Sequence, residues 1–304
     1  MNIDLVYTWV DGNDPEWIKK KENFIDKKIN TVGRFQDNNE LKYSLRSIEK
    51  HIPWIRKIFI ITDNQTPSFL DTKNPRIEII NHSEIIPKKY LPVFNSNTIE
   101  YFMYKIPELS EFFLYSNDDM FINEDLKPSF FFRNGLPIIR RKSNSLIKIK
   151  IQFKRAFNIR LNNYRLAIEN AYTIFKKKFN VFYPISPHHN IDAYLKSDIK
   201  TLVEDIFPEE LNKSFLNRFR HKSDIQRILI SYYSIFKKRG IMSIVNRKES
   251  CRMPVYKANY QRYIDKYNPK LFCLNDCEKA TDNERKLVEP FLKKLYPEKS
   301  SFEK

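Results

Sequence analysis

The chain has 304 residues, of which 41% are hydrophobic and 14% aromatic, so it is long and apolar enough to bury a substantial core. This composition argues against an intrinsically disordered chain. The formal net charge of +17, from 54 Lys and Arg against 37 Asp and Glu, favours anionic partners: phosphorylated substrates, acidic lipid surfaces or nucleic acid.

Several common classes of protein are excluded by simple patterns. No window approaches 18 uninterrupted apolar residues, so no membrane-spanning helix is expected, and no secretory leader is recognised at the start. Three cysteines are an odd set and favour a reduced, cytoplasmic compartment. The four glycines lack the spacing of a GxGxxG or Walker-type phosphate loop. They are Gly12, Gly33, Gly135 and Gly240.

Strand-like and helix-like segments alternate along the first 130 residues. Alternating, β-branched runs predict strands over residues 3–10, 55–62, 76–82 and 112–121. Helical spacing predicts helices over 16–30, 41–50 and 96–104. This order predicts an α/β fold with a mostly parallel central sheet, in which ligands bind outside the carboxyl ends of the strands.

Carboxylates follow three of the four predicted strands, namely Asp11, Asp63 and the adjacent pair Asp118–Asp119. A single Asp at a strand end is ordinary turn chemistry, which is the interpretation we favour for Asp63. Two adjacent like charges repel each other unless a cation or strong donors hold them. Asp118–Asp119 therefore indicates a site at this edge of the sheet.

The later half of the chain contributes basic and imidazole groups. Residues 146–179 contain nine Lys or Arg and one acid, with apolar residues at helical spacing, and predict a basic amphipathic helix or helical pair. Such a helix either packs on the core or contacts a membrane surface or polyanionic acceptor. Prolines then stiffen a loop that presents His188 and His189 before a helix predicted near Asn190, and a short strand over 271–274 ends in Asn275–Asp276.

Long segments of the chain resemble the conserved regions of the Stealth family of bacterial capsular polysaccharide phosphotransferases, which are related to the animal N-acetylglucosamine-1-phosphotransferase. The segments are DLVYTWVDGNDPEW, RFQDNNELKYSLRSIEKHIPWIRKIFIITDNQTPSFL, LPVFNSNTIEYFMYKIPELSEFFLYSNDDMF, PHHNID with RFRHKSDIQ, and FCLNDC. The resemblance implies a nucleotide-sugar transferase fold with Mg²⁺ or Mn²⁺. It also implies transfer of a sugar 1-phosphate from a UDP-sugar to a glycan hydroxyl, with release of UMP.

The resemblance also implies roles for individual residues. His188 is the expected base, Arg220 is the expected contact of the transferred phosphate, and Asp119 is an expected catalytic carboxylate. His189, His221 and Arg252 are further candidates. The expected metal ligands are Asp118, Asp119, Asn275 and Asp276, although Asn275–Asp276 also suits a helix N-cap. The expected donor-binding residues are Tyr7, Trp9, Asp11, Gly12, Arg34, Asp37 and Asn38. Trp9 could instead belong to the core, and Arg34 could pair with Asp37.

These expectations give a catalytic α/β domain over 1–139 and 180–304, and a basic helical insertion over 140–179 with a mobile join at 140–150. The expected partners are a UDP-sugar and a growing polysaccharide or lipid-linked glycan, with an anionic membrane face as a further candidate and no nucleic acid. The expected location is the cytoplasm, at or near the inner membrane face. An ordinary metal-dependent glycosyltransferase that releases UDP is the nearest alternative. A basic nucleic-acid-binding or membrane-binding module is the more distant one.

Overall fold

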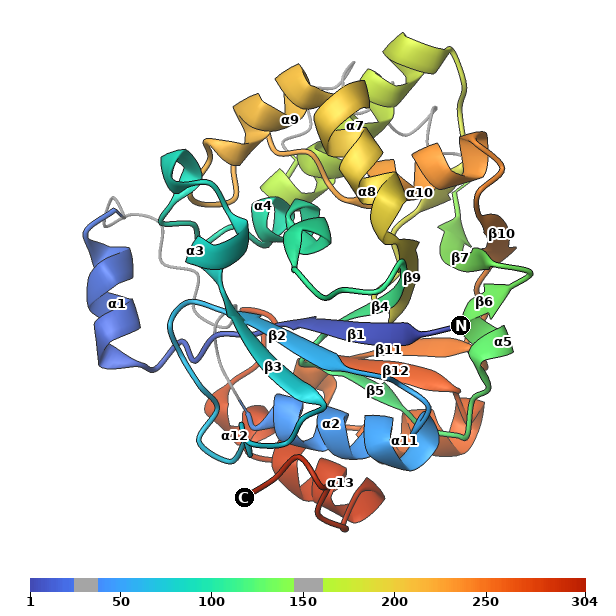
Figure 1. The fold of residues 1–304 in the computed structure, drawn as a ribbon. Coiled ribbons are helices and arrows are strands. Elements are labelled where there is room, and N and C mark those ends of the chain that lie inside the picture. Colours follow the sequence, from blue (N-terminus) through green and yellow to red (C-terminus); the bar gives the residue numbers. More distant parts are fainter. Residues whose placement is uncertain (25–37, 145–160) are drawn as a thin grey trace.

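The centre of the protein is a five-stranded sheet with strand order β3-β2-β1-β4-β9, seen nearly edge-on in Figure 1. The computed structural model describes residues 1–24, 38–144 and 161–304. Strands β1 to β4 are parallel to their neighbours and β9 is antiparallel to β4, so the prediction of a mostly parallel sheet is confirmed. The strands are β1 (Ile3–Thr8), β2 (Ile58–Thr62), β3 (Ile77–Asn81), β4 (Phe112–Asn117) and β9 (Asp192–Leu195).

Helices cover both faces of this sheet (Figure 1). On one face Leu41, Leu45 and Ile48 of α2 pack against the side chains of Leu5 and Tyr7, as their helical spacing predicted. Alternate strand residues point to the opposite face and pack against the other helices. The helices are α2 (Glu40–His51) on the first face, and α4 (Ser96–Tyr101), α7 (Asn163–Phe179), α8 (Lys196–Thr201), α9 (Pro208–Phe215) and α10 (Ile228–Phe236) on the second.

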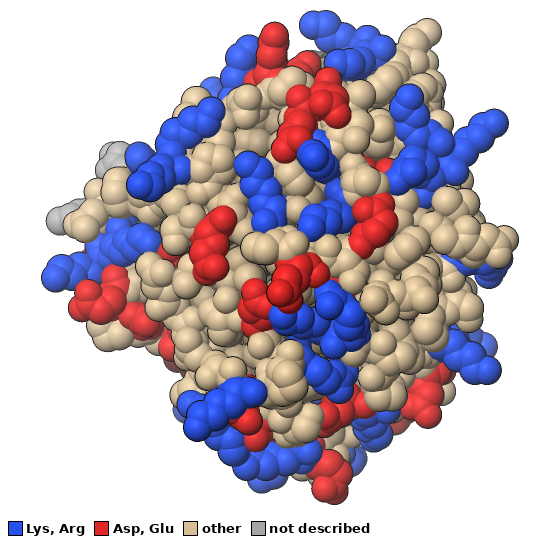
Figure 2. Space-filling model, in the orientation of Figure 1, with Lys and Arg blue, Asp and Glu red and all other residues tan. Residues whose placement is uncertain are grey.

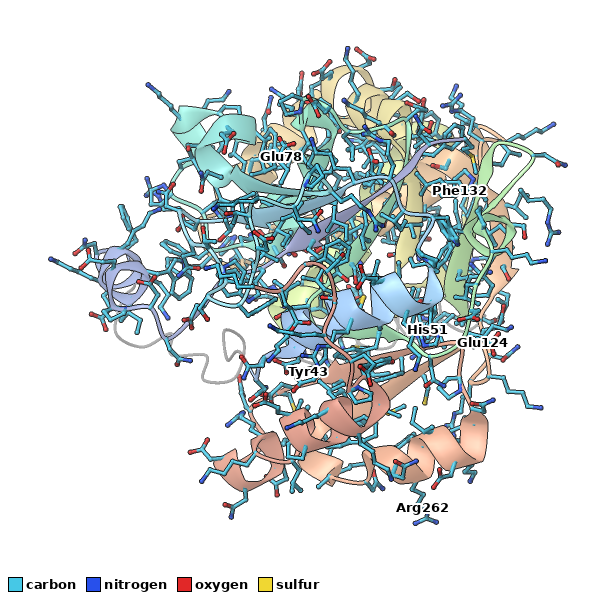
Figure 3. All side chains as sticks on the ribbon, turned by 60° about the horizontal axis from the view of Figure 1, so that its bottom comes forward. Tyr43, His51, Glu78, Glu124, Phe132 and Arg262 are labelled. Atoms are coloured by element: carbon cyan, nitrogen blue, oxygen red, sulfur yellow. The ribbon has the colours of Figure 1, made fainter. Side chains whose placement is uncertain are left out.

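A second sheet joins the end of the chain to the segment that follows the two acids. In it β12 (Leu271–Asn275) lies between β11 (Ser250–Pro254), which is parallel, and β5 (Met120–Ile122), which is antiparallel. Tyr43 of α2 packs with the C-terminal helices that cover this sheet (Figure 3). These helices are α11 (Tyr260–Tyr267), α12 (Asp282–Arg285) and α13 (Val288–Leu295).

A third group of strands flanks the central sheet. Its order is β10-β7-β6, and β8 pairs with β7. The remaining helices are short: α1 and α3 follow β1 and β3, and α5 precedes β6 (Figure 1). The bounds are β6 (Phe132–Arg133), β7 (Leu136–Ser143), β8 (Ile185–Ser186), β10 (Ile241–Ile244), α1 (Pro15–Glu22), α3 (His82–Ile85) and α5 (Pro128–Phe131).

Two local predictions were wrong. Residues 140–143, expected at a mobile join, extend β7, because the side chains of Arg140 and Arg141 are buried there. The segment after Asn190, expected to be helical, is strand β9, because pairing with β4 outweighs its local helical pattern; the helix α8 begins only at Lys196.

The basic segment is helical where the structure describes it. Helix α7 buries Ala167, Ala171 and Phe175 against the core and leaves the lysines of its last turn, Lys176 to Lys178, exposed. This favours a helix packed on the core with a solvated basic face. Residues 146–160 of the predicted segment lie outside the described residues, and the membrane contact stays a prediction.

Charge is not gathered into one basic face in the view of Figure 2. Lys and Arg side chains are spread over this face among acidic ones, and the two kinds adjoin near its centre. Within the residues that the structure describes, no helix is long and apolar enough to cross a membrane.

A buried ion network joins β7, β9, α4 and the start of α10. Asp192 accepts from Arg141 at 2.5 Å and from Arg227 at 3.1 Å, and Arg227 also pairs with Glu100 at 2.8 Å. Burial alone would raise the pKa of Asp192, but the two guanidinium groups hold it below its usual range. The network ties the second half of the chain to the central sheet.

Replacing Asp192 with Asn should destabilise the fold strongly. The change leaves two buried guanidinium groups short of negative charge, which costs about 3–5 kcal/mol of the free energy of unfolding. Urea denaturation measures it. The exposed carboxylate of Glu108, which pairs with Lys57 at 2.7 Å, provides the control: Glu108→Gln should cost far less than Asp192→Asn, because solvent screens an exposed pair. Equal losses in both variants would contradict this role of the network.

Candidate active site

The carboxyl ends of β1 and β4 lie side by side where the strand order changes direction. The chain goes from β1 to β2 and β3 on one side and returns to β4 on the other, with Thr8 opposite Asn117. In open α/β sheets this switch point is where ligands bind. A cavity of about 170 Å³ opens there. We call it the switch-point pocket; it is lined by Thr8, Trp9, Val10, Trp17, Ile61, His82, Val93, Phe94, Ser96, Ile99, Asn117, Asp118 and Arg220.

The switch-point pocket has aromatic walls and a charged end. The rings of Trp17 and Phe94 meet edge to face, with 5.5 Å between their centroids. Arg220 donates to the Ser96 hydroxyl at 3.0 Å and lines the same cavity as Asp118. A guanidinium near a carboxylate, beside flat apolar rings, suits a ligand with a base and phosphate groups.

Tyr115 fixes the end of strand β4. Its buried hydroxyl donates to Asn117 Oδ1 at 2.7 Å and lies 2.9 Å from Thr8 Oγ1. The ring of Tyr115 also lies under the Arg227 guanidinium, 4.6 Å from its centroid. The buried ion network therefore supports the strand end that presents Asp118.

Asp119 occupies the junction of the two sheets. Its backbone carbonyl accepts from Leu274 N at 2.9 Å, and its Oδ2 accepts from the Cys273 thiol at 3.2 Å. Burial raises the pKa of Asp119 to about 6. Its Oδ1 is buried and has no hydrogen-bond partner within the described ranges. A buried carboxylate oxygen without a hydrogen-bond partner is suited to binding a positively charged ligand.

Asn275 and Asp276 lie next to Asp119, as the sequence predicted, but each contacts an arginine. Asn275 Oδ1 accepts from Arg252 Nε at 2.8 Å, and Asp276 pairs with Arg285 at 2.7 Å. The N-cap alternative does not apply to them, because the next helix, α12, has Thr281 as its N-cap. Arg252 also lowers the pKa of Asp119, whereas Asp276 raises it.

We call the group formed by Asp118, Asp119, Asn275 and Asp276 the acid edge. Its side chains fit a divalent cation only in part. Across residues 1–24, 38–144 and 161–304, no three His, Cys, Asp or Glu side chains gather as a ligand set. Mg²⁺ needs fewer, because it binds through one or two carboxylates together with substrate phosphates and water. The partnerless Oδ1 of Asp119 fits such a ligand. Asn275 and Asp276 fit it less well, since the arginines already use their oxygens.

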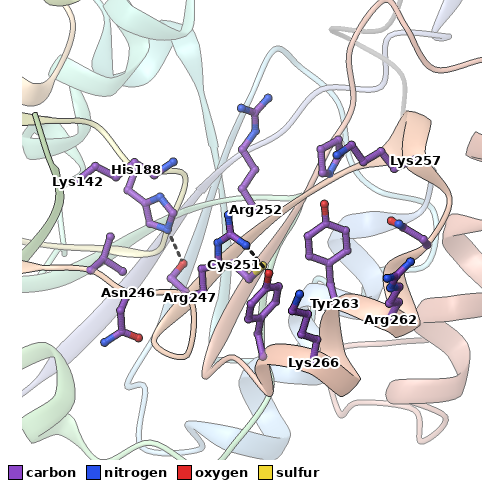
Figure 4. Close-up of a pocket in the computed structure, with 15 residues that line it drawn as sticks. Lys142, His188, Asn246, Arg247, Cys251, Arg252, Lys257, Arg262, Tyr263 and Lys266 are labelled. Carbon is purple, nitrogen blue, oxygen red and sulfur yellow. Dashed lines mark hydrogen bonds between the residues drawn. The ribbon is translucent and has the colours of Figure 1, made fainter.

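His188 lies in a second cavity of about 560 Å³ (Figure 4). Its side chain is buried, and its Nε2 lies 2.9 Å from the Ser250 hydroxyl. Six basic side chains line the same cavity, which we call the basic pocket. They are Lys142, Arg247, Arg252, Lys257, Arg262 and Lys266.

Both loop histidines are held neutral. Burial, reinforced by Lys142, lowers the pKa of His188 to about 4. Burial and Arg252 lower the pKa of His189 to about 3. The His189 ring stacks on Tyr164, with 6.4 Å between the ring centroids, and burial raises the pKa of Tyr164.

The predicted donor residues divide into three groups. Trp9 lines the switch-point pocket, although it is also largely buried in the core. Asp11 and Gly12 form the turn after β1, where the Asp11 backbone pairs with the Gln65 side chain at 2.9 and 3.0 Å. Tyr7 is fully buried and bonds Ser44 at 2.7 Å, so it offers no surface to a nucleotide.

The other predicted residues comprise two that the structure does not describe and two that it does. Arg34 and Asp37 fall outside the described residues. Asn38 bonds Glu40 and lines a separate cavity beside α12 and α13. The His221 ring lies within hydrogen-bond distance of the Ser223 hydroxyl, at 2.7 Å. Within the described residues, its side chain makes no hydrogen bond to the Arg220 side chain.

Sequence reasoning missed some pocket residues. His82 lines the switch-point pocket without any motif to mark it, and Trp17, which ends the segment DLVYTWVDGNDPEW, lines it without having been singled out. Burial lowers the pKa of His82 to about 4, and its Nδ1 lies 3.8 Å from Asp63. Asp63 itself pairs with Lys20 of α1 at 2.5 Å, which fits its interpretation as a structural residue.

Known proteins share both the fold and the sequence pattern. The galactosyltransferase LgtC, solved with donor and acceptor sugar analogues, superposes with a TM-score of 0.50 at 12% identity, over 98% of this chain and 96% of that one. At this identity the likeness shows the fold alone. Family models match Stealth protein conserved region 1 over residues 1–29, conserved region 2 over 34–138 and conserved region 4 over 264–304.

Curated relatives match along nearly the whole chain. The capsular polysaccharide phosphotransferase WcwK of Streptococcus pneumoniae is 34% identical, over 100% of this chain and 99% of the relative. The capsular polysaccharide phosphotransferase fcs1 of Haemophilus influenzae is 33% identical, over 92% of this chain and 80% of the relative. The segment with His188 and Arg220 lies between the matched regions 2 and 4.

The central sheet and its helices form an α/β fold of the kind seen in LgtC, with the candidate site at the carboxyl ends of its strands. The chain belongs to the Stealth family, and it is an enzyme of the phosphotransferase class.

Acid should destabilise the protein through its buried neutral histidines. The folded-state pKa of His82 is about 4 against 6.5 for an unperturbed histidine, so stability is present above pH 6.5 and falls as pH drops toward 4. The free energy of unfolding should fall between pH 7 and pH 5, and replacing His82 with Gln should make this fall smaller by about 2 kcal/mol, as measured by urea unfolding.

The exposed His221 provides the matched control, and His221→Gln should leave the acid sensitivity unchanged. Asp119 acts in the opposite direction, because its raised pKa favours the protonated folded state below about pH 6. An identical pH dependence in wild type and His82→Gln would contradict the assignment.

Proposed function

We propose that this enzyme transfers a sugar 1-phosphate from a UDP-sugar to a hydroxyl of a glycan, forms a phosphodiester and releases UMP during the synthesis of a capsular or cell-surface polysaccharide. The names of the curated relatives support phosphotransfer in capsule synthesis. The observation on which the proposal depends is the placement of Asp118 and Arg220 in one cavity at the switch point. Asp119 follows Asp118 directly in the chain, and the neutral His188 lines the basic pocket.

The switch-point pocket is the proposed donor site. Trp9, Trp17 and Phe94 offer apolar faces for the uracil and ribose. Arg220 is the proposed partner of the diphosphate, because a guanidinium binds two phosphate oxygens at once. Asp11 and Gly12 close the turn beside this pocket and remain proposed donor contacts.

The acid edge is the proposed metal site. Asp119 Oδ1, with Asp118 beside it, would hold Mg²⁺ or Mn²⁺, and a bound ion would neutralise diphosphate charge there. In this proposal Arg252 holds the Asn275 side chain and Arg285 holds the Asp276 side chain next to Asp119.

The proposed chemical step is a displacement at phosphorus. The acceptor oxygen bonds to the phosphorus that bears the sugar, the bond from that phosphorus to the UMP oxygen breaks, and UMP leaves with the electron pair. An imidazole takes the hydroxyl proton. His188 is our choice, since it lines the basic pocket and is held neutral; His189 is the second candidate. Phosphoryl transfer depends mainly on such positioning and charge neutralisation.

An ordinary glycosyltransferase is the second candidate function, favoured by the fold shared with LgtC. It would use the same donor, but the acceptor would attack the sugar carbon and UDP would leave. The two functions therefore differ in the nucleotide that is released.

The test is incubation with a panel of UDP-sugars, Mg²⁺ and a glycan acceptor, with mass spectrometry of the products. The proposal predicts UMP and a phosphodiester-linked sugar; UDP with a glycosidic product would contradict it. His188→Gln and Asp119→Asn should each lower turnover by about 100-fold or more. The exposed Asp125, 89% accessible at its side chain, supplies the control: Asp125→Asn should retain activity.

A further inference from the structure

The basic pocket gathers several cations, and no carboxylate among the described residues lines it. Six Lys and Arg side chains and His188 line it. None of the six basic side chains makes an ion pair with a carboxylate among residues 1–24, 38–144 and 161–304. By contrast, Arg46 in the described chain pairs with Glu303 at 2.7 Å.

The cations of the basic pocket act on one another. Burial and the charges of Arg252 and Arg247 lower the pKa of Lys142. The guanidinium of Arg247 contacts only neutral groups in the described surroundings: it bonds the Tyr267 hydroxyl and lies 5.0 Å from that ring's centroid. Like charges gathered in a cavity with low-dielectric walls attract an anion and gain stability when it binds.

Most of the pocket is built from residues 245–267, and Lys142 and His188 join it from earlier segments of the chain. Lys142 comes from β7, Arg247 from the turn before β11, Arg252 from β11, and Arg262 and Lys266 from α11. Figure 4 shows His188 and Lys142 on one side of the cavity and Arg262, Lys266 and Tyr263 on the other, with Arg252 between them. A volume of about 560 Å³ exceeds that of a single phosphate and accommodates sugar units beside it.

Arg252 connects this pocket to the acid edge. It lines the basic pocket and donates to Asn275 Oδ1 at 2.8 Å. The switch-point pocket, with Asp118, lies at the other side of the same acids. Two cavities of different chemistry therefore lie near these acids. The switch-point pocket has aromatic walls that suit a nucleotide, whereas the basic pocket is lined by cations and suits another anion.

We propose that the basic pocket binds an anionic saccharide, one that contains a phosphodiester or diphosphate group, and holds it as the acceptor of the transfer reaction next to His188. This proposal rests on the proposed function and adds the class of its acceptor. The shared chemistry is a phosphorylated glycan; the phosphate belongs either to the polymer itself or to the diphosphate of a carrier-linked glycan. Tyr263 and Tyr267 provide ring faces beside the cations for the sugar units.

The first test is calorimetric binding of inorganic pyrophosphate to the wild-type protein without donor. The double variant Arg262→Gln/Lys266→Gln should bind it about tenfold more weakly or worse, since two charge-assisted contacts are lost. The control, Lys176→Gln/Lys177→Gln on the exposed end of α7, removes the same charge and should bind as the wild type does. If both double variants bound pyrophosphate equally weakly, the loss would come from the lower net charge alone, and the proposal would be overturned.

UMP binding, measured in the same way, separates the two cavities. It should be unchanged in Arg262→Gln/Lys266→Gln. If UMP binding falls together with pyrophosphate binding, the basic pocket is the donor site and the proposal is wrong.

The second test compares three acceptors of equal length: a neutral oligosaccharide, one with an internal phosphodiester, and one with a terminal diphosphate. One phosphorylated acceptor should have a lower KM than the neutral one, and Arg262→Gln/Lys266→Gln should abolish that advantage with little change in kcat. The preferred acceptor identifies the source of the phosphate. Equal KM values for all three would overturn the proposal, whereas release of UDP instead of UMP would overturn only the proposed reaction.

Discussion

The position of the Asp119 carboxylate is the constraint on which the rest of the site depends. Strand β4 of the central sheet ends at Asn117 and β5 of the second sheet begins at Met120, so Asp118 and Asp119 are the link between two sheets. Hydrogen bonds from Leu274 N and the Cys273 thiol hold Asp119 there. The cost of burying its charge shows in its raised pKa, and an unpaired buried oxygen remains for a ligand.

The surroundings of this link divide the chemistry between two cavities. On one side the sheet's switch point supplies aromatic rings, Asp118 and Arg220. On the other, β11 and α11 supply cations without acids, with His188 at the wall. The buried Arg141–Asp192–Arg227–Glu100 network supports both sides, since it braces β4 through Tyr115 and lies behind the histidine loop.

The parallel sheet and its acidic edge could be predicted because strand patterns and turn residues are local signals. A common metal-binding role for Asn275–Asp276 and Asp118–Asp119 was expected from the family motifs; Leu274 N bonds the Asp119 carbonyl, so the two segments adjoin, and the metal-binding role stays a prediction. Tyr7 could not be assigned, because alternation along β1 does not say which face holds the pocket; its side chain points to α2 and Ser44. The basic pocket was not predicted: five of its cations lie within residues 247–266 and follow no recognised motif, and only the tertiary fold brings Lys142 and His188 to them.

The most direct test of the account is a crystal structure of the protein with a non-hydrolysable UDP-sugar analogue and Mg²⁺. The account predicts uridine against Trp9 in the switch-point pocket, with the diphosphate between Asp119 and Arg220. A nucleotide seated among Arg247, Arg262 and Lys266, with the acid edge untouched, would contradict it.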